Sequence, residues 1–227
     1  MTAGLAIGGA VLLGGQEDHL TLAKQDALDS IIALTDARAV SYHANADESW
    51  YLADPARATQ YQDDFLTNAQ QFVDVGSASF FGYDTALTAD VDAYQSDYTD
   101  VPFGGDLGAE FRNITFPGER AAATRALLAY QVYERDDERL RVMAVSNLDQ
   151  AIAFDVGTSP GQLGWAFSNL TTALGDVIAI NETAFTAAVH DGDNIDNGWD
   201  AVIPAVAATA IAGLTVAGAW RRVAEYR

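Results

Sequence analysis

Residues 201–220 read AVIPAVAATAIAGLTVAGAW, a run without a single charged side chain. A helix rises about 1.5 Å per residue, so a run of this length spans about 30 Å, the thickness of a bilayer core. The stretch therefore predicts a transmembrane helix over residues 199–220. A buried core helix of a soluble protein is the alternative, although such helices are rarely so long and free of charge.

The residues that flank this run indicate its orientation. Trp199 and Trp220 stand at its two ends, where aromatic side chains favour the membrane interface. Arg221 and Arg222 follow at once, and basic residues beside a span favour the cytoplasmic side. Residues 221–227 are accordingly predicted to form a basic cytoplasmic tail, which places the preceding domain on the extracytoplasmic side.

A second uncharged run, TAGLAIGGAVLLGG, occupies residues 2–15. It is short for a complete span and lacks the positive residues that begin a signal peptide. We expect a first transmembrane helix over residues 1–16, truncated at its cytoplasmic start. The alternative is the apolar core of a signal sequence. With two spans, residues 17–198 are predicted to form one extracytoplasmic domain.

Charge and cysteine content exclude several classes of function. The chain has 32 Asp+Glu against 12 Lys+Arg, a net charge of −20, and no cysteine. An acidic surface without a basic patch argues against nucleic-acid binding, because nothing would neutralise the phosphates. The absence of cysteine excludes disulfides, thiol nucleophiles and cysteine-ligated metal sites. An acidic composition fits an extracytoplasmic domain and also fits adaptation to salt.

The apolar periodicity between the two runs is helical throughout. Long helices are predicted over residues 18–53 and 55–75 and from Pro117 onward, followed by a shorter helix near residues 148–156. The last long helix is predicted to start at Ser159-Pro-Gly-Gln, with Ser159 as its cap and Pro160 in its first turn, and to run to about residue 190. Both ends of the domain must return to one membrane surface, and four antiparallel helices achieve this most simply. The predicted fold is therefore all-α, an up-down antiparallel four-helix bundle flanked by two transmembrane helices.

The spacing also predicts which side chains face the core. In the first helix, three-to-four spacing predicts one apolar face with these residues: Leu28, Ile31, Ile32, Thr35, Ala39, Tyr42, Ala46 and Trp50. The second helix is predicted to bury Tyr61, Phe65, Ala69 and Phe72. The predicted stripe of the last helix has these residues: Leu163, Ala166, Phe167, Leu170, Ala173, Leu174, Val177, Asn181, Ala184, Phe185 and Ala188.

Between the second and third long helices the pattern is less regular. Residues 76–116 are predicted to contain loops at 80–83 and 101–105, with a short helix near 86–98. The run ERDDERLR at residues 134–141 is predicted to be solvated and to carry ion pairs between successive turns. A partner-docking face is the alternative for this run.

No catalytic or metal-binding motif stands out. His19, His43 and His190 are scattered, without the spacing of metal ligands, and no nucleophile elbow, P-loop or dinucleotide fingerprint is present. Residues 190–200 resemble a calcium loop superficially, but the EF-hand register fails, so a polar linker is expected and divalent binding is the alternative. We therefore predict no enzymatic activity, no metal and no cofactor.

The most plausible recognition stretch is residues 106–120, DLGAEFRNITFPGER. It brings Arg112, Asn113 and Arg120 together in an otherwise acidic domain, and arginine binds carboxylates in a bidentate manner. These residues are candidate contacts for an amino-acid-like ligand; the alternative is that the arginines pair with neighbouring acids. Asn181 lies on an apolar stripe, either as a buried polar residue that fixes helix register or as a fourth ligand contact.

Three segments carry a resemblance to a known family. NADESWYL at 45–52, NITFPGER at 113–120 and AIAFDVGT at 151–158 are similar to an actinobacterial family of two-span membrane proteins. The arrangement also resembles the helical sensor modules of bacterial chemoreceptors and histidine kinases. The resemblance implies a relay of amino-acid availability from a solute-binding lipoprotein to a cytosolic serine/threonine kinase. It brings no catalytic signature and no site residues.

The functional expectation is a membrane sensor or partner-binding domain that relays the state of a ligand or of a solute-binding protein. Its expected partners are the membrane, a protein partner or a small amino-acid-like ligand, and a second copy in a homodimer. Only seven residues follow the predicted second span, so we expect no signalling output module, unless the chain is a fragment or signals by associating with another subunit. The alternative function is a structural or accessory subunit of a membrane protein complex.

Overall fold

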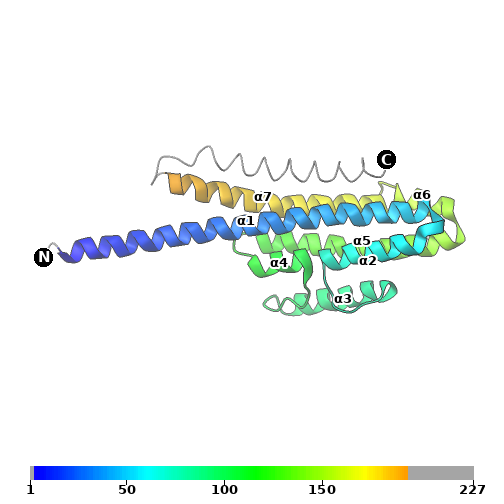
Figure 1. Cartoon of the computed structure of the whole chain (residues 1–227), viewed down its shortest axis with the longest axis horizontal. Helices are drawn as coiled ribbons and strands as arrows, with labels where there is room; N and C mark the ends of the chain where they lie inside the picture. The colour runs from blue at the N-terminus through cyan, green and yellow to red at the C-terminus, as the bar shows by residue number, and fades with distance from the viewer. Residues whose placement is uncertain (1–2, 194–227) are drawn as a thin grey trace. The chain divides into compact units, whose positions relative to one another are not determined.

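The computed structural model describes residues 3–193, with side chains for residues 23–190. Throughout this range the chain is helical, with seven α-helices, one 3-10 turn and no strand (Figure 1). The predicted all-α class is confirmed. The predicted span over residues 199–220 and the tail over residues 221–227 lie outside the described residues, as does most of the linker that was compared with a calcium loop.

The chain divides into two compact units, and the larger, Ala23–Phe185, contains helices α2 to α6 complete. The helices have these bounds: α1 Ala3–Ala53, η1 Pro55–Arg57, α2 Ala58–Phe72, α3 Phe80–Ser96, α4 Gly105–Asn113, α5 Glu119–Ser146, α6 Leu148–Asp155 and α7 Leu163–Asp193. Helix α1 thus includes the predicted helix over 18–53 and continues without a break into the uncharged run before it.

Helices α1 and α2 lie side by side and run in opposite directions. The Asn68 amide of α2 donates to the Asp47 carboxylate of α1 at 2.7 Å. Nearer the connecting turn, Tyr61 stacks on Trp50 with ring centroids 6.2 Å apart. Residue numbers therefore rise along one helix as they fall along the other.

Helix α5 runs in the same direction as α1. Just before α5 begins, Thr115 contacts the Asp26 carboxylate at 3.4 Å. Further along both helices, Tyr133 of α5 donates to Glu48 of α1 at 2.9 Å. Later residues of α5 thus meet later residues of α1.

Helix α7 runs opposite to α5. Phe167, near the start of α7, packs on Tyr133 with ring centroids 5.6 Å apart, while Asp176 lies 4.0 Å from Arg125, earlier in α5. Within Ala23–Phe185 the long helices α1, α2, α5 and α7 therefore alternate in direction along the chain (Figure 1).

The buried face of α1 differs from the predicted one. Leu28, Ile32, Tyr42 and Trp50 are all more than a third exposed. The face that is buried instead follows a strict alternation of three and four residues: Ala27, Ser30, Leu34, Ala37, Ser41, Ala44 and Glu48. Small side chains on this face let the neighbouring helices approach closely, which the larger apolar stripe would prevent.

The predicted buried face of α2 is confirmed, and that of α7 is confirmed in part. Tyr61, Phe65, Ala69 and Phe72 are the buried residues of α2. The predicted stripe of α7 is buried at Leu163, Ala166, Leu170, Leu174, Val177, Asn181 and Ala188. Its other members, Phe167, Ala173, Ala184 and Phe185, are only partly buried. The segment Leu163–His190 is also the one helix among the described residues that is long and apolar enough to cross a membrane. Its apolar stripe packs in the core of the compact unit.

The region between α2 and α5 is more helical than predicted. Residues 80–83, expected in a loop, form the first turn of α3, because the Tyr83 hydroxyl is anchored to the carbonyls of Ala69 and Val73 at 2.9 and 2.7 Å. Helix α4 begins at Gly105, where φ is 75° and a Cβ atom would lie 2.7 Å from the Gln71 carbonyl. Only glycine fits so close to the end of α2.

The predicted start of the last long helix is partly confirmed. The Gln162 side chain accepts a hydrogen bond from the Ser159 amide at 3.0 Å, which is one half of a capping box. The helix itself begins after this turn, at Leu163.

Candidate functional site

The most unusual feature of the compact unit is a set of charged side chains buried on one face of α5. The solvent-exposed fractions of Glu134, Asp137 and Arg141 are only 5%, 1% and 2%. Their spacing of three and four residues places them on one side of the helix. The prediction that residues 134–141 are solvated is therefore wrong for the face that carries these side chains. That face continues the buried stripe that begins with Ala122 and Ala126.

Arg141 and Asp137 form a two-pronged ion pair. The Arg141 Nε lies 2.8 Å from Asp137 Oδ2, and its second terminal nitrogen donates to Oδ1 at 3.0 Å. The guanidinium carbon also lies 4.4, 4.8 and 4.6 Å from the ring centroids of Tyr51, Phe65 and Phe80. These rings come from α1, α2 and α3, so three helices cage one cation. Burial acts to lower the pKa of Arg141, but the adjacent Asp137 carboxylate outweighs it and raises that pKa.

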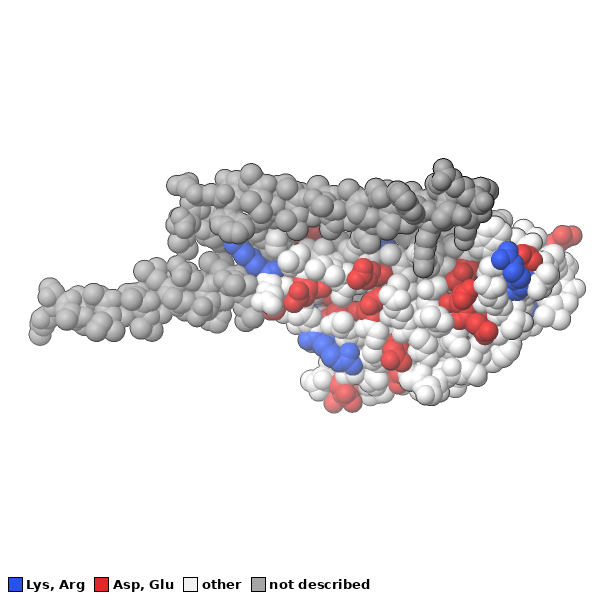
Figure 2. All heavy atoms as spheres, viewed as in Figure 1, with Lys and Arg blue, Asp and Glu red and all other residues white. Residues whose placement is uncertain are grey.

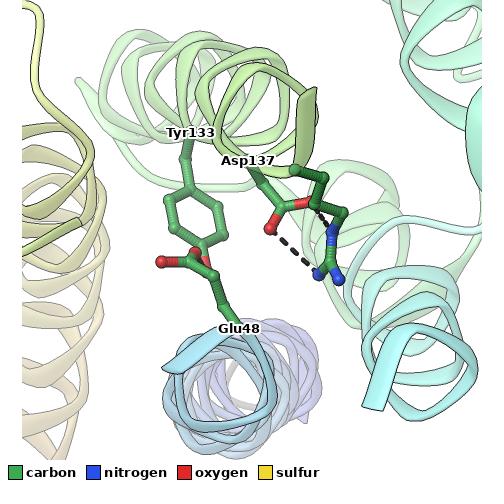
Figure 3. A network of polar contacts seen from close by, with 4 residues as sticks. Glu48, Tyr133 and Asp137 are labelled. Atoms are coloured by element: carbon green, nitrogen blue, oxygen red, sulfur yellow. Dashed lines mark hydrogen bonds and ion pairs between the residues drawn. The ribbon is translucent and has the colours of Figure 1, made fainter. Parts of the chain in front are cut away.

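Glu48 contributes a buried carboxyl group from α1. Tyr133 of α5 donates to Glu48 Oε2 at 2.9 Å, and Figure 3 shows Tyr133 and Asp137 projecting from one helix toward the helix that carries Glu48. Burial, followed by the nearby charge of Asp137, raises the pKa of Glu48 well above its usual range.

Glu134 lines a small hollow beside the ion pair. We call it the acidic hollow; it is lined by Phe65, Leu66, Phe80, Tyr83, Asp84, Glu134, Asp137 and Glu138. Its volume is about 10 Å³, which is room for one water-sized group. Glu134 Oε1 and Asp84 Oδ1 are buried atoms without a hydrogen-bond partner among the described residues. Burial, followed by the charge of Asp137, raises the pKa of Glu134 well above its usual range.

Carboxyl groups outnumber cations in this region. Glu48, Glu134 and Asp137 are all buried, and Arg141 is the buried cation among the described residues. An unpaired buried charge is strongly unfavourable, so the excess carboxyl groups either hold protons or require a cation from outside the chain. Burial raises the pKa of Glu48 and of Glu134, and this direction favours the first of these two outcomes.

A second buried acidic pair lies where α4 meets α5. Glu119 accepts hydrogen bonds from the backbone amides of Thr115 and Phe116 at 2.7 and 2.8 Å and so fixes the start of α5. Glu110 faces it from α4. Burial and the neighbouring Glu119 charge raise the pKa of Glu110 to about 7, and the nearby Ser30 side chain opposes part of this rise.

The predicted recognition arginines contact backbone carbonyls and a tyrosine rather than acids. Arg112 donates to the carbonyls of Val101 and Phe103 at 3.1 and 2.6 Å. Arg120 donates to the Tyr94 hydroxyl at 3.1 Å and to the carbonyl of Tyr98 at 3.0 Å. Each arginine thus holds the segment between α3 and α4 in place. These contacts do not include the pairing with neighbouring acids that was the alternative.

The two predicted asparagines also have local partners. Asn113 donates to the Asp26 carbonyl at 2.7 Å and to the Ser30 hydroxyl at 2.9 Å, which ties α4 to α1. Asn181 is fully buried on α7 and donates to the Val177 carbonyl at 3.2 Å, while its side-chain oxygen has no described partner. Among the hydrogen bonds of the described residues, none joins any two of the four predicted site residues, and their role in ligand binding stays a prediction.

Sequence reasoning missed the buried cluster although a signal for it exists. Glu48 continues the three-four alternation of small residues in α1, and Tyr130, Glu134, Asp137 and Arg141 follow the same alternation in α5. Position on a buried stripe, rather than polarity, would have identified them. Among residues 23–190 no group of His, Cys, Asp or Glu side chains is arranged to hold a metal ion.

Comparison with known proteins gives no relative: no family model, no curated protein and no solved structure matches the chain.

Proposed function

We propose that the chain is a sensor or partner-binding domain of a membrane signalling protein, displayed on the extracytoplasmic side. In this proposal α1, α2, α5 and α7 form an up-down four-helix bundle carried by transmembrane helices at residues 1–16 and 199–220. The state of a ligand or of a bound solute-binding protein passes to the membrane as a small displacement of α1 against α7.

The observation that carries the proposal is the continuity of two helices. Helix α1 passes from Leu22 to Ala23, and α7 passes from Phe185 to Thr186, without interruption at the limits of the compact unit. An unbroken helix transmits a shift along its axis, whereas a flexible linker absorbs it. In the sequence, the uncharged runs at residues 2–15 and 201–220 lie beyond these two limits.

The surface of the compact unit supports contact with a partner. Exposed apolar side chains occur in the last turns of α5 and in α6, with Val145 86% and Val156 67% exposed. Acidic side chains are spread over the face shown in Figure 2, and basic ones form a few isolated groups. An acidic surface with exposed valines fits a partner that supplies both apolar contacts and positive charge.

The side of the membrane on which the domain lies is tested by labelling single cysteines in intact cells. The chain contains no cysteine of its own, so each introduced cysteine is the only labelling site. Val145→Cys in the full chain should react with a membrane-impermeant maleimide before the cells are opened. Leu170→Cys, which is fully buried, is the control and should react only after denaturation. Protection of Val145→Cys until the membrane is broken would place the domain on the cytoplasmic side and overturn the proposal.

The relay is tested by the distance between spin labels on α1 and α7. Labels at Asp29→Cys and Thr183→Cys occupy exposed positions of the two helices. In the full chain, in lipid nanodiscs, the distance should change when amino acids, organic anions or Ca²⁺ are added. A distance that none of them changes would favour the alternative function, an accessory subunit of a membrane complex.

The exposed valines of α5 and α6 favour this second function as well. An accessory subunit needs a permanent apolar contact, and residues such as Val142 and Val145 would then be covered in the assembled complex. The labelling experiment separates the two functions, because Val145→Cys of the sensor reacts in intact cells, whereas a permanent partner would protect it even after the membrane is broken.

A further inference from the structure

We propose that the acidic hollow between α2, α3 and α5 binds the ammonium group of a small primary amine. The ligand class deepens the proposed sensor function and rests on it. Binding itself can be measured without any relay to the membrane, so the two can fail separately.

The hollow contains carboxyl oxygens without hydrogen-bond donors among the described residues, and an ammonium group would supply such donors. Glu134 is nine-tenths buried and lines the hollow, and its Oε1 has no described hydrogen-bond partner. Across from α5, Asp84 of α3 presents a second buried oxygen without a partner. A primary ammonium group carries three N–H donors and a positive charge, so it satisfies two such oxygens and leaves one donor for a third.

The walls of the hollow already hold one cation of the chain. Phe65 and Phe80 line the hollow and also cover the Arg141 guanidinium, at 4.8 and 4.6 Å. Asp137 likewise lines the hollow and pairs with Arg141. Around Arg141, aromatic rings and a carboxylate therefore hold a cation. Phe65, Phe80 and Asp137 also line the hollow beside Glu134, where the described residues supply no cation.

The size of the hollow selects among cations. A volume of about 10 Å³ admits a group the size of a water molecule. A primary ammonium nitrogen fits, with its carbon chain directed to the opening, whereas a quaternary ammonium or a guanidinium is too large. A divalent metal is disfavoured because no set of three ligands converges among residues 23–190.

Binding of the amine must compete with a proton. Glu134 faces Tyr130, Asp137, Glu138 and Arg141 of its own helix. The polar groups that face it from α3 are Tyr83 and Asp84, while α2 supplies Phe65 and Leu66. Since burial raises the pKa of Glu134 in the empty hollow, a cation that binds there releases a proton. Amine binding should therefore strengthen as the pH rises, up to the pKa of the amine itself.

Thermal unfolding of the full chain in detergent tests the proposal, with methylammonium as the probe. At matched ionic strength, methylammonium chloride should raise the melting temperature above that in sodium chloride or tetramethylammonium chloride, because a ligand of the folded state stabilises it by mass action. Equal melting temperatures in all three salts would mean that the chain responds only to ionic strength, and would overturn the proposal.

Glu134→Gln should weaken methylammonium binding by at least about tenfold, because a charge-assisted hydrogen bond is lost. Glutamine resembles the protonated glutamic acid, so the fold should be kept; Asp84→Asn provides the same test from the other helix. Asp92→Asn, an exposed acid of α3, is the matched control and should leave binding unchanged.

Unchanged binding in both hollow variants would overturn the assignment of the site. If methylammonium binds but the label distance between α1 and α7 does not change, the proposed relay is refuted and the proposed amine site is supported. If another compound changes the label distance and methylammonium does not bind, the proposed amine site is refuted and the proposed sensor function is supported.

Discussion

Two stretches of the chain are rich in charge, residues 106–120 and residues 134–141, and the structure uses their arginines in opposite ways. In the first, Arg112 and Arg120 are exposed and donate to backbone carbonyls. In the second, Asp137 and Arg141 are almost completely buried and bind each other. The first was predicted to recognise a ligand and the second to be solvated.

The difference shows that helical register decides burial here more than polarity does. The charged residues of 134–141 that are buried fall on the same stripe as Leu127 and Tyr130, while Arg135 and Arg139 between them are exposed. A buried charge persists at such a position because other helices supply its partner. Polar residues on a core stripe are therefore candidates for a site, and those at loop junctions are candidates for local bracing.

The largest effect should come from removing the buried cation. Arg141→Met leaves Asp137 without its partner, and breaking a buried ion pair costs about 3–5 kcal/mol of unfolding free energy. Chemical denaturation of the full chain measures this loss. Arg135→Met, at an exposed position of the same helix, should change stability by no more than about 0.5 kcal/mol.

The double variant Asp137→Asn with Arg141→Met sharpens the interpretation. Because it removes both buried charges, it should be more stable than Arg141→Met alone. Equal losses in Arg141→Met and Arg135→Met would mean that the ion pair is not buried in solution, and the contrast between the two stretches would disappear.

The next effect depends on pH and concerns Glu110. Folding raises the pKa of this carboxyl from 4.5 to about 7 through burial and the Glu119 charge. Between these two pH values the folded chain therefore keeps a proton that the unfolded chain has already released. The contribution of Glu110 to the free energy of unfolding is fully present at low pH and is lost as the pH rises through about 7. Asp106, whose pKa burial and Asp36 raise to about 6, acts in the same direction.

Glu110→Gln should remove the Glu110 part of this pH dependence. Above about pH 8 the variant should be more stable than the wild type by up to about 3 kcal/mol, and below about pH 4 the two should agree. Thermal melting of both chains across this range is the measurement. A constant difference at all pH values would contradict a buried proton at Glu110.

A smaller loss of stability is expected for Arg112→Ala. The variant loses hydrogen bonds to the carbonyls of Val101 and Phe103, which should cost about 1–2 kcal/mol. Urea denaturation of the full chain measures it. Unchanged stability together with loss of a ligand would instead support the original prediction that Arg112 recognises a ligand.

The smallest effect on stability is expected for Val145→Asp. This side chain is 86% exposed, so the unfolding free energy should change by no more than about 0.5 kcal/mol. Its effect should be on association, measured as the size of the native membrane complex before and after the substitution. A large loss of stability would show that Val145 is covered within the chain itself.

The sequence alone determined the all-helical class, the position of α6, the buried face of α2 and most of that of α7, because apolar side chains at three-to-four spacing have few other ways to leave water. It could not choose between two stripes on α1. One carries large apolar residues such as Ile32 and Tyr42, and the other carries small residues and Glu48. Only the helices packed against α1 decided that the second is buried.

The candidate site was likewise decided by tertiary structure. Tyr51, Phe65 and Phe80 belong to three different helices, and nothing in their local sequence indicates that they surround one guanidinium. A charged side chain is stable in a core only if the rest of the fold supplies rings, hydrogen bonds and counter-charge around it. Local sequence encodes the helix and its register, and the assembled helices determine what a buried charge can bind.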